Sequence, residues 1–424
     1  MTDSYAPQSG DRSFDVESYD LELSYRVRTN RLEGTAVITA VANEDLRSFA
    51  LDLVGLRATR VRVDGDRRTS FQPGPRKLRV NLPRPVRAGE RFAVEVVYAG
   101  APAPRSSRWG AIGWEELEDG AIVASQPTGA PTWFPCNDRP DDRARYRIAL
   151  TTDAPYAVAA TGRRVSQTRA GARVTSVYES SVPTATYLAA VHVGRYREVT
   201  IADAPVEVAL VHPPALSASA ARAFAPAGAM LDVFANSFGP YPQETCRIVV
   251  TADQLEIPLE AQGLVVFGAN HLDPEYERLV AHELAHQWFG NSVGIARWQD
   301  IWLNEGFACY AEWVWSEASG GTTADELAAV HHRALDALPQ DLVISDPGPD
   351  LMFDDRLYKR GALTLHALRR TLGDELFFDL LRAWCARHRH GLVTTDDLRE
   401  LVEPLGAGRL LTDWIDRRRL PRLP

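Results

Sequence analysis

Residues 279–289, Leu-Val-Ala-His-Glu-Leu-Ala-His-Gln-Trp-Phe, decide the fold of the second half of the chain. On a helix, predicted here over residues 275–290, His282 and His286 lie on one face, one turn apart, and can share one metal ion. Glu283 directly follows the first histidine and can reach a water on that metal as general base. The apolar neighbours suit a buried helix. The stretch therefore predicts a metal centre built on a helix.

A third ligand is needed, because catalytic zinc takes three protein ligands and keeps the fourth position open for water. The run Trp302–Ala308, Trp-Leu-Asn-Glu-Gly-Phe-Ala, supplies Glu305, which follows His286 by 19 positions on the next predicted helix. Two antiparallel helices joined by a loop bring such residues together. Glu312 lies on the same helical face as Glu305, and we expect it to orient a ligating histidine. Asp300 is a weaker candidate for that role. One zinc ion per chain is predicted.

Helical periodicity dominates the chain after about residue 200. It predicts further helices over residues 218–238, 304–318, 323–338, 356–371, 374–389 and 395–404. A short β section, Arg247–Thr251 and Gly263–Phe267, lies between the first of these helices and the histidine motif.

The first half of the chain has the pattern of β-strands. Apolar residues alternate with polar ones in Tyr19–Val27, Leu78–Leu82 and Phe92–Tyr98, which means one buried and one solvated face. Turn signals separate these runs, as in an all-β sandwich. We therefore expect a disordered tail at residues 1–12, a β-sandwich domain at 13–200 and a catalytic domain at 201–424.

Composition restricts the class of protein. A chain of 424 residues exceeds what one core usually serves, so two or three domains are expected. The net charge of -9 argues against nucleic acid as a partner. Neither a signal peptide nor an apolar run long enough to span a membrane is present. The four cysteines form no paired motif and are expected to be buried thiols in a reducing cytoplasm.

Together the motifs resemble the gluzincin zinc aminopeptidases, a family that includes aminopeptidase N and the bifunctional leukotriene-hydrolysing aminopeptidase. The resemblance covers nearly the whole chain. Phe134–Asp138, Phe-Pro-Cys-Asn-Asp, is similar to the family segment at the end of the N-terminal sandwich. Tyr358–Gly361 resembles the Tyr-x-Lys-Gly segment that carries a catalytic tyrosine, with Arg360 where the family usually has lysine.

One family motif is altered. The family usually shows Gly-x-Met-Glu-Asn ahead of the first histidine, whereas this chain has Ile257–Leu264, Ile-Pro-Leu-Glu-Ala-Gln-Gly-Leu. The Glu-x-x-Gly-Leu frame aligns Glu260 with the glutamate that binds the substrate amine. Gln126 resembles a substrate-contacting position of the family.

The resemblance implies a multidomain α+β fold, with an N-terminal all-β sandwich followed by a thermolysin-like, mostly helical catalytic domain. The implied reaction removes the N-terminal residue of peptides that have a free N-terminus. Glu283 would activate water, Tyr358 would stabilise the oxyanion, and Glu260 with Gln126 would bind the ammonium. Larger relatives carry a further helical domain after the catalytic one. We expect a short form without it, and hence an open zinc cleft.

Three alternatives remain open from the sequence. The same zinc centre could serve an endopeptidase, or an enzyme acting on a non-peptide substrate, as one relative opens an epoxide. The chain could also be an inactive scaffold that binds partners through its sandwich. Intact zinc ligands and an intact general base argue against the scaffold.

Overall fold

The computed structural model describes residues 3–203 and 205–424. Packing divides the chain into two compact units, each assembled from separate stretches of sequence. The N-terminal unit contains Met1–Val199, Ala209–Ala218 and Glu244–Asn270, and the C-terminal unit contains Thr200–Val208, Ser219–Gln243 and His271–Pro424.

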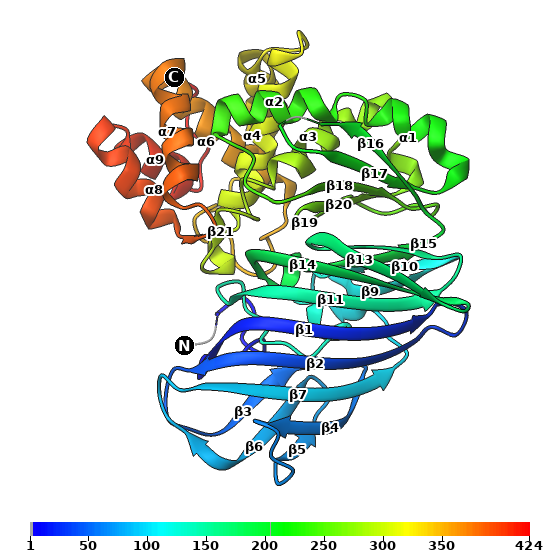
Figure 1. The fold of residues 1–424 in the computed structure, drawn as a ribbon. Helices are drawn as coiled ribbons and strands as arrows, with labels where there is room; N and C mark the ends of the chain where they lie inside the picture. The colour runs from blue at the N-terminus through cyan, green and yellow to red at the C-terminus, as the bar shows by residue number, and fades with distance from the viewer. Residues whose placement is uncertain (1–2, 204) are drawn as a thin grey trace. The chain divides into compact units, whose positions relative to one another are not determined.

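A seven-stranded sheet forms the framework of the N-terminal unit (Figure 1). At its centre β1 (Phe14–Arg26) pairs in parallel with β11 (Arg143–Asp153) and antiparallel with β2 (Arg31–Ala42). The sheet order is β13 (Arg163–Ala170), β14 (Arg173–Ala185), β11, β1, β2, β7 (Arg91–Gly100) and β4 (Arg57–Val63). Along β1 buried and solvated residues largely alternate, as the sequence pattern predicts.

Two smaller sheets cover the apolar face of this framework. One has the order β3 (Leu46–Asp52), β6 (Lys77–Val86) and β5 (Ser70–Pro73). The other has the order β12 (Ala157–Ala160), β15 (Val191–Gly194), β10 (Gly120–Ala124), β9 (Gly110–Leu117) and β8 (Arg105–Ser107). Phe14 of β1 packs on Phe49 of β3 with ring centroids 5.3 Å apart, and Tyr25 of β1 packs on Trp114 of β9 at 4.7 Å. Sheet-on-sheet packing thus builds the core.

The prediction of a disordered tail at residues 1–12 is wrong for residues 3–12, whereas residues 1–2 lie outside the described part of the chain. The backbone N–H of Asp11 donates to Asn137 Oδ1 at 2.6 Å, and Asp11 Oδ2 accepts from the backbone N–H of Ala50 at 2.9 Å. These partners are distant in sequence, so local composition could not reveal them.

Residues 244–270 pack with the N-terminal unit, so the division by packing crosses the boundary predicted near residue 200. Arg247 Nη1 donates to Gly162 O at 2.7 Å, and Gln262 N donates to Leu188 O at 3.0 Å. The strands here belong to a sheet with the order β16 (Arg197–Ala202), β17 (Val208–His212), β18 (Cys246–Val250), β20 (Leu264–Phe267) and β19 (Leu259–Ala261).

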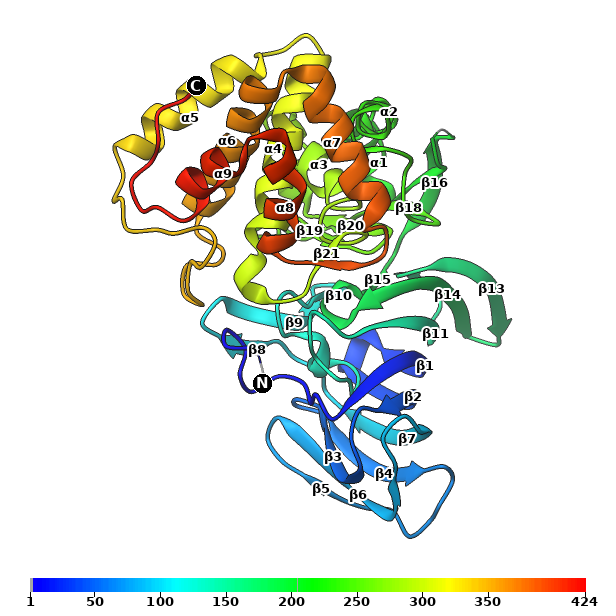
Figure 2. The same ribbon diagram turned by 90° about the vertical axis from the view of Figure 1, so that its left-hand side faces the viewer.

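Helices form most of the C-terminal unit (Figure 2). They are α2 (Ala227–Phe238), α3 (Glu277–Ala285), α4 (Trp302–Ala318), α5 (Ala324–Asp336), α6 (Asp355–Leu372), α7 (Asp374–Arg387), α8 (Thr395–Val402) and α9 (Gly408–Ile415). The short strands β21 (Gly294–Ile295) and β22 (Leu392–Val393) pair in parallel. All four cysteines of the chain are buried thiols outside any disulfide. Within residues 3–203 and 205–424, no helix is both long and apolar enough to cross a membrane.

Two predicted helices differ from what their apolar pattern suggested: one is interrupted and the other ends early. The helix predicted over 218–238 is split into α1 (Ser217–Ala223) and α2, because Pro226 has no N–H to continue the first helix. The helix predicted over 275–290 stops at Ala285, and the chain then turns through Gly290 with φ of 108°.

Helices α4 and α6 approach each other backbone to backbone. A Cβ on Gly306 would lie 2.8 Å from the Cα of Gly361, and a Cβ on Gly361 would lie 2.6 Å from the Cα of Gly306. Only glycine at both positions permits this crossing. Gly306 follows Glu305 directly, so the crossing lies beside a residue predicted to bind metal.

Candidate active site

His282 and His286 occupy the C-terminal end of α3. Their side chains are buried, with 7% and 1% of each residue exposed, and their ring centroids lie 4.8 Å apart. His286 caps the helix, and its N–H donates to the carbonyl of His282 at 3.2 Å. The helix therefore aligns both imidazoles on one face, as the spacing predicts.

Glu305, on the first turn of α4, completes a group of three donors. Its Oε2 lies 3.6 Å from His282 Nε2 and 3.4 Å from His286 Nε2. Zinc–ligand distances of about 2.0–2.1 Å in a tetrahedron put neighbouring donors about 3.4 Å apart. Among the described residues, this is the group of at least three histidine, cysteine or carboxylate side chains whose ligand atoms all lie within 4.8 Å. Donor types and spacing both fit zinc.

The outer nitrogens of both histidines are held by acceptors. His282 Nδ1 lies 2.9 Å from Glu312 Oε1, and His286 Nδ1 lies 2.9 Å from the carbonyl oxygen of Phe289. An N–H at each Nδ1 leaves the lone pair on Nε2, the atom that faces Glu305. Glu312 thus occupies the place predicted for it.

Cationic side chains surround Glu312. Arg278 Nη1, from the first turn of α3, lies 3.3 Å from Glu312 Oε2. Lys359 donates to Cys309 Sγ at 3.3 Å, and its charge also acts on Glu312. Burial raises the pKa of Glu312, but the His282 hydrogen bond and the nearby cations outweigh burial and lower that pKa to about 2. Glu312 is therefore a carboxylate acceptor at neutral pH.

The buried carboxylates make this a site for a cation. Burial lowers the pKa of His282, but hydrogen bonds to Glu305 and Glu312 outweigh it and raise that pKa to about 9. Burial raises the pKa of Glu305, but the charges and hydrogen bonds of His286 and His282 lower it to about 2. Either a proton or a metal ion can supply the positive charge these groups require. A divalent ion on Nε2 takes the place of that proton.

Glu283 and Tyr358 lie next to the three donors. Glu283 is on α3 between the two histidines and is 5% exposed. Tyr358, on the first turn of α6, stacks on His282 with ring centroids 6.1 Å apart and an interplanar angle of 17°. The candidate general base, Glu283, and the candidate oxyanion donor, Tyr358, therefore lie beside the metal donors.

Arg360, at the lysine position of the Tyr-x-Lys-Gly pattern, points away from this chemistry. Its guanidinium is buried and donates to the carbonyl oxygens of Trp414 at 2.8 Å, Leu342 at 3.2 Å and Arg418 at 2.6 Å. Burial lowers the pKa of Arg360 to about 10. The planar fork of arginine suits several carbonyls at once, so Arg360 fastens residues 414–418 to α6.

Glu260 and Gln126 form a pair within the N-terminal unit. Gln126 Nε2 donates to Glu260 Oε1 at 2.7 Å, and Glu260, on β19, is 8% exposed. The structure thus brings together the two residues that the family resemblance assigned to the substrate. Asp300 belongs to another network, in which it accepts from Thr395 N at 3.0 Å and Thr395 Oγ1 at 2.7 Å.

Sequence reasoning missed three features of this site. Arg278 precedes His282 by one helical turn, so the α3 pattern could have placed it on the histidine face. The contact of Lys359 with Cys309 joins two helices and has no local signal. The carbonyl oxygen of Phe289 became available only because the helix ends at Ala285.

Comparison with known proteins identifies the family. Residues 222–413 match the model described as "Peptidase family M1 domain", and residues 15–188 match "Peptidase M1 N-terminal domain". A crystal structure of an M1 zinc metallopeptidase mutant from Deinococcus radiodurans, bound to a Tyr-Ser-Ala substrate, has a TM-score of 0.92 and 32% identity. That comparison covers 100% of this chain and 99% of the other. The chain belongs to the M1 family. Its fold class, a β-sheet domain followed by a helical catalytic domain, is confirmed.

Sequence relatives are members of the M1 family that are longer than this chain. Aminopeptidase M1-A of Oryza sativa subsp. japonica is 30% identical over 340 residues, covering 72% of this chain and 38% of that protein. Endoplasmic reticulum aminopeptidase 1 of Homo sapiens is 27% identical over 420 residues, covering 90% of this chain and 44% of that protein. The chain thus spans less than half of either relative.

The cofactor prediction is confirmed: His282, His286 and Glu305 form the M1 zinc site.

Proposed function

We propose that this M1 protein is a zinc-dependent aminopeptidase that hydrolyses the N-terminal peptide bond of peptides with a free amino group. The observation that carries the proposal is the convergence of two histidines and Glu305 beside a buried glutamate, Glu283. The M1 relatives named as aminopeptidases support the exopeptidase form of the reaction.

Glu283 is assigned the proton transfers. Zinc in such a site lowers the pKa of water and polarises a scissile carbonyl. Glu283 is a buried carboxylate next to the donors and is not one of them, whereas Glu312, the other carboxylate beside them, is hydrogen-bonded to His282 Nδ1. It is therefore placed to accept a proton from the attacking water and to return it to the leaving amine.

Tyr358 is assigned the stabilisation of the oxyanion. Its ring lies against His282, and a phenol donates one hydrogen bond. A donor aimed at the developing negative charge contributes about 3–4 kcal/mol in comparable sites. Glu312 holds His282 in the tautomer that the zinc site requires.

Glu260 and Gln126 are assigned the substrate ammonium. The Gln126 amide donates to one carboxylate oxygen of Glu260 and thereby holds it in one orientation. A carboxylate in a partly dry site makes charge-assisted hydrogen bonds with an ammonium group. This contact would fix the register at the first peptide bond, so one residue is released per cycle.

A panel of substrates tests the proposal. Zinc-loaded protein is given aminoacyl fluorophores and short peptides, each with a free and an N-acetylated amino terminus. Turnover of the free amines and poor turnover of the acetylated forms are expected. Glu283→Gln should keep zinc but lose about 10²–10⁴-fold in kcat. Glu260→Gln should lower kcat/KM on free amines only. Equal cleavage of blocked peptides or of internal bonds would refute the aminopeptidase assignment and favour an endopeptidase.

A further inference from the structure

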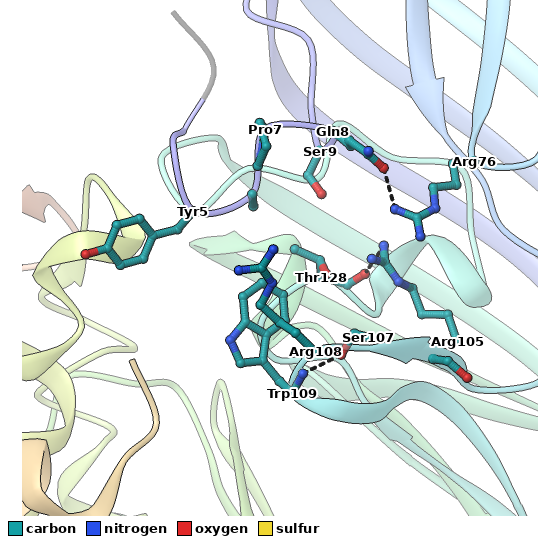
Figure 3. Close-up of a pocket in the computed structure, with 12 residues that line it drawn as sticks. Tyr5, Pro7, Gln8, Ser9, Arg76, Arg105, Ser107, Arg108, Trp109 and Thr128 are labelled. Atoms are coloured by element: carbon teal, nitrogen blue, oxygen red, sulfur yellow. Dashed lines mark hydrogen bonds between the residues drawn. The ribbon is translucent and has the colours of Figure 1, made fainter. Parts of the chain in front are cut away.

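The N-terminal unit contains a pocket that the zinc chemistry does not use. Its volume is about 500 Å³, in the range typical of small-molecule sites. It is lined by residues 5–9, Arg76, residues 105–109 and Thr128, which all belong to the N-terminal unit (Figure 3).

The lining of this pocket is strongly basic. Three arginines, Arg76, Arg105 and Arg108, contribute to it, and none of the described lining residues is an aspartate or glutamate. In the part of the chain that the structure describes, neither Arg76 nor Arg105 has a carboxylate in ion-pair distance. Figure 3 shows the guanidinium ends of these two residues pointing toward one another. Arg105 is half-buried and Arg76 is exposed, and the repulsion between two such like charges costs free energy that a bound anion would offset.

Arg105 does not use all of its hydrogen-bond donors within the protein. One Nη1–H donates to Thr128 O at 3.2 Å, whereas the Nε–H is buried and has no hydrogen-bond partner. Burial first, and then the charge of Arg76, lower the pKa of Arg105, although the buried carboxylates Asp52 and Asp138 partly compensate. A buried donor without an acceptor is unfavourable, and an oxyanion would satisfy it.

Part of the remaining wall is apolar, and the rest carries hydroxyl and amide groups of Gln8, Ser9, residues 106–107 and Thr128. The ring of Trp109 lines the pocket with Arg108 Cζ 5.8 Å from its centroid, and Ala6 and Pro7 add apolar surface. Guanidinium groups bind carboxylates and phosphates in pairs of parallel hydrogen bonds, and aromatic faces accept flat groups. We propose that this pocket binds a small organic oxyanion, a carboxylate or a phosphate attached to a flat apolar group, through Arg105 and Arg76.

Simple probes can test this site. Isothermal titration of zinc-loaded protein would use phenyl phosphate and benzoate, with benzamide as the uncharged analogue of benzoate. We expect at least one anion to bind and benzamide to bind about tenfold more weakly or not at all. The stronger of the two anions tells whether phosphate or carboxylate is the preferred group.

Charge-matched variants locate the binding. Arg105→Gln and Arg76→Gln should each weaken the anion about tenfold, because each removes charge-assisted hydrogen bonds. Arg57→Gln removes the same charge from an exposed position on β4 and should change nothing. Thermal melting checks that each variant is folded. If Arg105→Gln is unstable, Arg76→Gln still tests the site, because Arg76 is exposed and its substitution should leave the fold intact.

Three outcomes would overturn the proposal. The first is that neither anion binds at millimolar concentration. The second is that benzamide binds as well as benzoate. The third is that affinity is unchanged in both arginine variants or falls equally in Arg57→Gln. An anion held at the zinc ion would survive the arginine substitutions and would thus give the third outcome.

Discussion

Glu312 is not one of the three metal donors, but it determines which ring nitrogen of His282 is available to the metal. It accepts a hydrogen bond from His282 Nδ1 at 2.9 Å, which leaves Nε2 as the coordinating atom. Glu312→Ala should therefore weaken zinc affinity about 10–100-fold, as removal of such partners does elsewhere. Glu312→Gln keeps an acceptor oxygen and should lose less. Competition with a fluorescent zinc chelator measures both affinities.

A carboxylate elsewhere provides the control for this prediction. Glu400 is exposed on α8, so Glu400→Ala removes one negative charge without touching a histidine. If Glu400→Ala and Glu312→Ala weaken zinc equally, the effect comes from net charge and the orienting role of Glu312 is wrong.

Tyr358 offers a second prediction at the scale of one residue. Its hydroxyl is needed mainly in the transition state, so Tyr358→Phe should lower kcat more than it raises KM. The expected loss in kcat is about 10²–10³-fold, the cost of one oxyanion donor. If the folded, zinc-loaded variant has a normal kcat, Tyr358 only packs on His282 and does not stabilise the oxyanion.

Spacing along a helix explains which site residues could be predicted from sequence. His282, His286, Glu305 and Glu312 follow helical periodicity within two helices, so local pattern reveals them. Lys359 acts on Glu312 from a third helix, and no local pattern records that contact.

Among the helices, the pair α4 and α6 links the zinc ligand to Tyr358. Gly306 and Gly361 let the two backbones meet, and an added Cβ would lie 2.8 or 2.6 Å from the opposite Cα. Gly306→Ala and Gly361→Ala should each destabilise the protein by about 1–3 kcal/mol, because the helices must move apart. Each should also lower kcat, since separation displaces Glu305 from Tyr358. Chemical denaturation and steady-state kinetics provide the two measurements.

The double variant strengthens this test. One separation of the helices makes room for both methyl groups. The loss in free energy of unfolding in the double variant should therefore be smaller than the sum of the two single losses. Fully additive losses would mean that each alanine is accommodated by a separate local change, and the shared crossing would not be the cause.

Element boundaries were less predictable than element types. Pro226 marks the break between α1 and α2 and could have been recognised in the sequence. The early end of α3 was harder to foresee, because apolar residues continue through Phe289.

For the whole molecule, zinc binding should be coupled to stability. A ligand that binds only the folded chain stabilises it by about 2.7 kcal/mol at a concentration of 100 Kd. Chelation of zinc should therefore lower the Tm of the transition that unfolds the C-terminal unit by about 5–10 °C. Calorimetry with and without zinc measures the shift.

Two controls make the stability prediction specific. His286→Ala should melt at the same temperature with and without zinc, because a ligand is missing. Magnesium should not replace zinc, because it prefers oxygen ligands. A zinc-dependent shift that persists in His286→Ala would place the stabilising ion elsewhere.

The exact division of the chain into two units could not be predicted from sequence patterns. The change from strands to helices near residue 200 is visible in the sequence, but residues 244–270 return to the N-terminal unit. Their contacts, such as Arg247 to Gly162, join segments that no periodicity relates. The juxtaposition of Arg76 and Arg105 is equally invisible, because it depends on how two sheets meet.

The close approach of Gly306 and Gly361 also restricts the mutational paths open to this protein. Neither position can accept even the smallest side chain alone, so a single-step change at either one is a loss. In a library randomised at both codons and selected for activity, glycine should be recovered at both positions. Improved variants must then arise elsewhere, in side chains that can change without parting the two helices.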